Sequence, residues 1–167
     1  MALSMYQASV PVFVKYLNGM TRVLDKATPL IEARKIDQAV LAGLRIYPDM
    51  LPFSRQIQIA SDNAKGPVAR LAGIEVPKYE DTETTIAEFK ARIAKTIDFV
   101  KSVKPAQIEG SEDRTIVLPV GQNKIEFKGA DYLTTFALPN FLFHVTTAYN
   151  ILRHIGVEIG KRDYMDR

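Results

Sequence analysis

A run of 21 residues, Tyr132 to Leu152, contains no Lys, Arg, Asp or Glu, although these four types make up 25% of the chain. Charged side chains mark the solvated face of a helix, so their absence predicts a segment enclosed on nearly every side. The run is long enough to span a bilayer, but Pro139, Asn140, His144 and four threonines make it a poor membrane segment. We therefore expect it inside a helical bundle or shared with a second subunit.

Four stretches of the chain have apolar residues at spacings of three and four, which is typical of helices that bury one face. They are residues 4–27, 52–72, 84–103 and 131–154. Gly73 and Gly156 follow the second and the fourth stretch, where a glycine commonly ends a helix. Thr82 or Thr84 is suited to cap the third, and a short helix is expected over 38–44.

Between the third and fourth stretches, residues 115–119 and 124–127 alternate apolar and polar side chains on either side of a turn at Gly121. This pattern predicts a β-hairpin. The predicted fold class is therefore all-α, a four-helix bundle with a small β-hairpin between helices 3 and 4. A chain of 167 residues fits one domain over 1–167.

Composition excludes several kinds of chemistry. The chain has no cysteine, which rules out cysteine nucleophiles, iron–sulfur clusters and thiolate zinc sites. Its first residues lack a basic segment followed by an apolar core, so no secretory signal is expected and a cytoplasmic location is predicted. Lys90, Arg92 and Lys95 make the third stretch basic, but no aromatic residues alternate with them. We interpret these residues as a solvated face, because single-stranded nucleic acid would require a stacking platform.

His144 is the candidate functional residue, since a histidine inside a charge-free run needs a polar partner. Asn140 lies four residues earlier, on the same helical face. Gln58 and Asp62 lie at the edge of the apolar stripe of the second stretch, and a bundle core could bring all four groups together. Such a set could form a ligand pocket or a weak metal site.

Simpler roles remain open for the same residues. His144 can be a core histidine that is hydrogen-bonded to a neighbouring carboxylate, hydroxyl or carbonyl group. Asp62 can pair with Lys65 or Arg55 at a helix surface. Asn140 follows Pro139 and can satisfy the backbone hydrogen bonding that the proline interrupts.

Several segments together resemble a bacterial family of unknown function that is similar to the DinB/YfiT-like superfamily. They run over residues 5–13, 47–65, 141–154 and 159–164. The resemblance implies a four-helix bundle that is commonly dimeric. It also implies that many members bind a divalent metal through three histidines, one on the second helix and an H-x-x-x-H pair on the last. Some members are thiol-dependent transferases or isomerases.

Carried over by position, His144 stands at the second histidine of that pair and Asn140 at the first. The second-helix histidine has no counterpart, and Gln58 and Asp62 are the nearest polar groups. The resemblance therefore implies a degenerate metal site.

The sequence leads to two functional hypotheses. The first is a DinB-like bundle protein with a small polar pocket around His144 that binds a small molecule, without a resident cofactor. The alternative is a metal-dependent DinB-like thiol transferase or isomerase with zinc or nickel at the degenerate site, so enzymatic activity stays open. Residues 131–154 are expected to form a homodimer interface, and neither membrane insertion nor nucleic-acid binding is expected.

Overall fold

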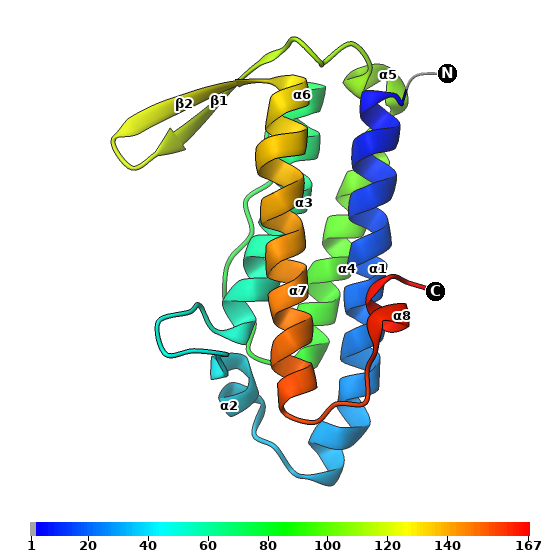
Figure 1. Cartoon of the computed structure of the whole chain (residues 1–167), viewed down its shortest axis with the longest axis vertical. Helices are drawn as coiled ribbons and strands as arrows, with labels where there is room; N and C mark the ends of the chain where they lie inside the picture. The colour runs from blue at the N-terminus through cyan, green and yellow to red at the C-terminus, as the bar shows by residue number, and fades with distance from the viewer. Residues whose placement is uncertain (1–2) are drawn as a thin grey trace.

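The computed structural model describes residues 3–167, in which four long helices lie side by side (Figure 1). These are α1 (Met5–Ala33), α3 (Phe53–Ala72), α4 (Ile86–Ser102) and α7 (Leu138–His154). Shorter helices are α2 (Gln38–Gly43), α5 (Pro105–Ile108), α6 (Gly129–Asp131) and α8 (Lys161–Tyr164). Strands β1 (Thr115–Val120) and β2 (Asn123–Lys128) form a two-stranded antiparallel sheet. The mostly helical fold with a small sheet is confirmed, and the single domain over 1–167 stays a prediction.

Local capping sets where the helices begin and end. Ser4 accepts a hydrogen bond from the backbone N–H of Gln7 and starts α1, and Thr85 forms the corresponding capping box with Glu88 at the start of α4. The expected cap at Thr82 or Thr84 was therefore wrong by a residue or more. Gly73 ends α3 with φ of 70°, a left-handed conformation that favours glycine.

Helices α3 and α4 run in the same direction because a long segment returns along the bundle between them (Figure 1). Both helices begin near α2: the Phe53 N–H bonds to the Leu44 carbonyl, and the Ile86 N–H bonds to the Gln38 side chain. The connecting segment, residues 74–85, lies against α3 and α4. We refer to residues 74–85 as the strap.

The core consists of the apolar stripes of the four long helices. Phe13 meets Phe141 edge to face, and Phe53 meets Phe89 in the same way. The sheet adds Ile116 and Leu118, each about 95% shielded from solvent. Among residues 3–167, no helix combines the length and apolarity needed to cross a membrane.

The charge-free run differs from its prediction in two respects. Its first six residues form a π-helix, η1 (Tyr132–Ala137), in which the Leu138 N–H bonds to the Leu133 carbonyl. The widened turns end directly before Pro139, which has no N–H to continue the helical pattern. One face of the run is also exposed in the single chain, so the chain alone does not enclose it; enclosure by a second subunit stays a prediction. That face is formed by Thr134, Thr135, Pro139, Phe143, Thr146 and Asn150.

Candidate functional site

His144 on α7 is hydrogen-bonded to Gln56 on α3, with 2.7 Å between Nδ1 and the amide oxygen Oε1. The Gln56 amide nitrogen donates to the Leu51 carbonyl over 2.8 Å, which fixes the orientation of the amide. Gln56 is 1% exposed, so neither bond is shared with bulk water. Because Oε1 can only accept, Nδ1 of His144 must carry the hydrogen, and Nε2 is left with a lone pair.

Burial lowers the pKa of His144 below its ordinary value. The cause is the loss of solvent around the charged form, and Gln56 supplies no charge to offset it. The ring is only partly buried, and the exposed Phe143 ring meets it edge to face at a centroid distance of 5.2 Å. At neutral pH, the geometry therefore provides a neutral imidazole whose Nε2 can accept a hydrogen bond or donate its lone pair.

None of the other three predicted site residues hydrogen-bonds to this imidazole in the described chain. The Asn140 amide donates to the Phe136 carbonyl over 2.7 Å, which is the backbone role considered from the sequence. Gln58 and Asp62 both bond to side chains from the strap or α4. On a helix they lie about 200° and 240° around the axis from Gln56, so α3 separates them from His144. The described chain shows no side-chain hydrogen bond that links His144 to Asn140, Gln58 or Asp62. A pocket shared by these four residues stays a prediction.

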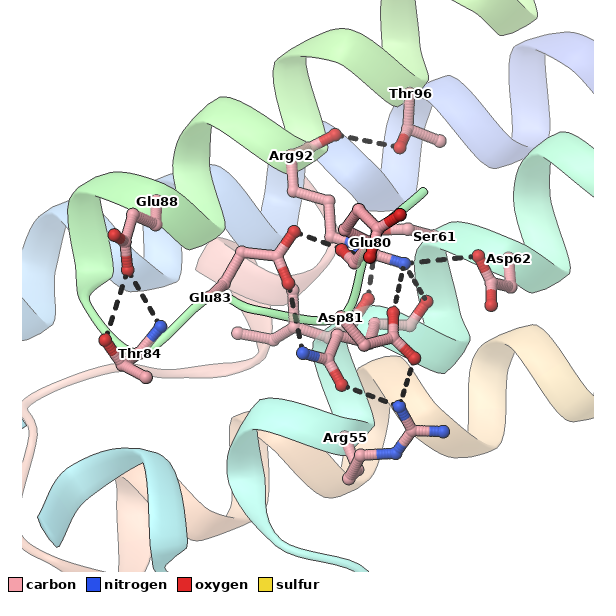
Figure 2. A network of polar contacts seen from close by, with 12 residues as sticks. Arg55, Ser61, Asp62, Glu80, Asp81, Glu83, Thr84, Glu88, Arg92 and Thr96 are labelled. Atoms are coloured by element: carbon pink, nitrogen blue, oxygen red, sulfur yellow. Dashed lines mark hydrogen bonds and ion pairs between the residues drawn. The ribbon is translucent and has the colours of Figure 1, made fainter. Parts of the chain in front are cut away.

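Gln58 and Asp62 belong instead to a polar network centred on Arg92 of α4. Figure 2 shows Asp62 and Arg92 in this network. Only 2% of the Arg92 side chain is exposed. Its Nη1 bonds to Glu83 over 2.9 Å, and its Nη2 to Asp62 and Asp81 over 3.2 and 3.0 Å. Nη1 and Nη2 also reach the backbone carbonyls of Glu80 and Gln58.

The network extends along the strap. Arg55 of α3 pairs with Asp81, and the Gln58 amide donates to Glu83 over 3.0 Å. The ring of Tyr79 packs under cations, with Lys65 Nζ at 4.7 Å and Lys95 Nζ at 4.2 Å from its centroid. The network therefore fastens the strap to α3 and α4, and its charged groups are already paired with one another.

The sequence reasoning missed the roles of Gln56 and Arg92. Arg92 was assigned to a solvated basic face, but it lies next to Ile93 in the buried stripe that Phe89 and Thr96 share. The sequence could have indicated that Arg92 is buried, because it lies three residues after Phe89 and four before Thr96 on the same helical face. For Gln56 the only signal was its place next to Ile57, and the contact with a residue 88 positions later could not be read from spacing.

The fold is that of a DinB-like helical protein. A crystal structure described as a DinB family member from Shewanella denitrificans is 40% identical to the chain, with a TM-score of 0.89. The match covers 96% of this chain and 90% of that one. No curated protein matches the chain significantly.

The chain belongs to the family described as Domain of unknown function (DUF1993), whose model matches residues 5–165. The resemblance drawn from the sequence motifs, to a family of unknown function of DinB-like type, is thus confirmed.

The residues around His144 offer a metal fewer ligands than the three histidines that the superfamily resemblance implies. Within residues 3–167, no group of three or more His, Cys, Asp or Glu side chains could hold an ion. The nearest polar partner, Gln56, already binds Nδ1 through its only acceptor oxygen. The Asn140 amide nitrogen is engaged by a backbone carbonyl.

Proposed function

We propose that this DinB-like protein, a four-helix bundle of the DinB/YfiT type, binds a small molecule at His144. One observation carries the proposal: Gln56 holds the imidazole as the Nδ1–H tautomer while the ring stays partly accessible. Fixing a tautomer in this way leaves Nε2 as a defined acceptor in the bundle wall.

The site favours an uncharged ligand with a hydrogen-bond donor. A neutral imidazole attracts no anion, and the desolvation that lowers the pKa of His144 disfavours charge beside it. Phe143 is 56% exposed and its ring adjoins the imidazole, so the ring can cover an apolar part of the ligand. An N–H or O–H group on such a ligand would donate to Nε2.

Histidine-selective ¹⁵N NMR tests this proposal directly, because the chain has only two histidines. The spectrum should show His144 as the Nδ1–H tautomer, with His154→Gln used to assign the signals. A binder found by thermal-shift screening of small thiols, amides and alcohols should then shift Nε2 of His144 and raise the melting temperature. In the matched variant Gln56→Leu, His144 should no longer be held as the Nδ1–H tautomer, and the affinity for the ligand should fall.

Two results would count against small-molecule binding at His144. One is the Nε2–H tautomer in the free protein, and the other is a binder whose affinity His144→Ala leaves unchanged. The alternative of metal-dependent transfer is tested in the same samples. Zinc or nickel that co-purifies in stoichiometric amount and is lost in His144→Ala would favour that alternative.

A further inference from the structure

A hollow lies near the C-terminal half of α3, between that helix, strand β1 and η1. Figure 1 shows the hairpin and α3 that border it. Its volume is about 230 Å³, and it is lined by α3, by Leu118 and Pro119 of β1, and by two aromatic residues of η1. Neither His144 nor Gln56 takes part in it. We call this hollow the hairpin groove.

Arg70 is a guanidinium that is held in place but lacks an anion. Its Nη1 donates to the hydroxyl of Tyr132 over 3.2 Å, and burial raises the pKa of that phenol, which keeps it protonated. The side chain lies over Gly66, where an added Cβ would come within 2.6 Å of Nη1. In the described chain no carboxylate pairs with Arg70, so Nε and Nη2 are left to bind a ligand.

Two further polar groups face the groove with unused capacity. The side-chain amide of Asn63 makes no hydrogen bond within residues 3–167. Asp62 uses only Oδ1, toward Lys65 and Arg92, and its Oδ2 has no partner in the part of the chain described. Because the guanidinium lies over Gly66, Asp62 is one helical turn away, about 6 Å along the axis.

The aromatic wall of the groove comes from the π-helix. Tyr132 and Phe136 stack with their centroids 5.9 Å apart and their planes 21° apart, and Phe127 of β2 packs against both. A π-helix is rare and is found frequently at functional sites. Here its turns present Tyr132 and Phe136 to the same hollow as Arg70.

We infer that the hairpin groove binds a small organic acid with one carboxylate and one hydrogen-bond donor, the chemistry of an amino acid. The carboxylate pairs with the free edge of Arg70, a geometry that guanidinium favours. The donor group meets Asp62 Oδ2 and Asn63, and the apolar part covers Phe136 and Pro119. Asp62 repels a dianion, so a phosphate is disfavoured.

A titration followed by ¹H–¹⁵N NMR tests this inference with three probes: L-phenylalanine, phenylacetate and inorganic phosphate. L-Phenylalanine should give saturable shifts at Asn63, at Arg70 Nε and at the Phe136 amide, with a Kd of about 1 mM. Phenylacetate should bind several-fold more weakly, and phosphate should not saturate. Arg70→Gln should weaken L-phenylalanine at least tenfold, whereas Lys101→Gln, the same charge change on an exposed part of α4, should leave binding unchanged.

Two more variants separate the effect of the position of the Arg70 guanidinium from the effect of the Asp62 charge. Gly66→Ala keeps the guanidinium but displaces it, and should weaken the binding of both L-phenylalanine and phenylacetate. Asp62→Asn should weaken L-phenylalanine more than phenylacetate. The inference is overturned if Arg70→Gln binds L-phenylalanine like the wild type, if phosphate binds as tightly as L-phenylalanine, or if neither carboxylate shifts these residues up to about 10 mM.

Discussion

Replacing Arg92 with Met should lower the free energy of unfolding more than replacing any other charged residue of α4. Methionine keeps the unbranched stem but removes every bond that the guanidinium makes to the strap and to α3. The Glu83 bond lies in the least exposed part of the network, with 2% and 14% of the two side chains exposed. Losing a bond of this kind costs about 1.5–3 kcal/mol.

The two remaining carboxylates contribute less because water can rehydrate them. Asp62 and Asp81 are 47% and 36% exposed, and pairs of this kind are worth about 0–1 kcal/mol each. The total for Arg92→Met is therefore about 3 kcal/mol. For a chain of this size such a loss lowers the melting temperature by about 6–12 °C.

Urea and thermal unfolding measure this loss, and Lys90→Met provides the matched control. Lys90 also lies on α4 and pairs with Asp25, but both side chains are well exposed, at 39% and 51%. Its replacement should cost less than about 1 kcal/mol. Hydrogen exchange should show that Arg92→Met loosens residues 74–85 first. Equal losses in the two variants, or unchanged exchange in the strap, would refute the reasoning.

Three other predictions follow from single residues. His144 should titrate below the ordinary histidine pKa of about 6.5. Because the unfolded chain then takes up the proton at a higher pH than the folded one, the free energy of unfolding should fall as pH drops below about 6.5. The variant His144→Gln should show a smaller fall. Light scattering should show the wild type as a dimer of twice 18.7 kDa and Phe143→Glu as a monomer. The exposed face of the charge-free run can pair with the same face of a second copy without bringing like charges together. A monomeric wild type would contradict this prediction. Gly73→Ala should cost about 1 kcal/mol in urea unfolding, since its φ of 70° disfavours a Cβ, and an unchanged midpoint would argue against that conformation.

Much of the fold could be predicted because its signals are local. The spacing of Phe53, Ile57 and Ala60 places one face of α3 in the core, and Gly73 ends the helix where a left-handed residue is needed. The π-helix could not be predicted in the same way. Proline can interrupt a helix in several ways, and the rings of the widened turns, Tyr132 and Phe136, pack against Phe127 of the hairpin, a contact that spacing along the chain does not reveal.

The candidate site was predictable only in part because its contacts join distant segments. A polar partner for His144 followed from burial alone, but the choice of Gln56 over Gln58 depends on how α3 is rotated against α7. Those two glutamines lie about 200° apart on the helix, so naming the right one requires knowing which side of α3 faces α7, and spacing along the chain does not say that. Arg92 shows the same difficulty, since a charged residue at a buried helical position is easily taken for part of the exposed face beside it.

The resemblance to metal-binding bundles gains a physical meaning from these contacts. Where the superfamily pattern implies a first histidine, Asn140 gives its amide hydrogen to a backbone carbonyl. From the second long helix, Gln56 reaches the retained imidazole and gives it a hydrogen-bond acceptor. The Gln56 oxygen is thus engaged by Nδ1 and the Asn140 nitrogen by a backbone carbonyl. In the residues that the structure describes, His144 belongs to no group of three or more His, Cys, Asp or Glu side chains. The proposed ligand, which donates one hydrogen bond to Nε2, therefore asks less of the site than an ion that needs several donors.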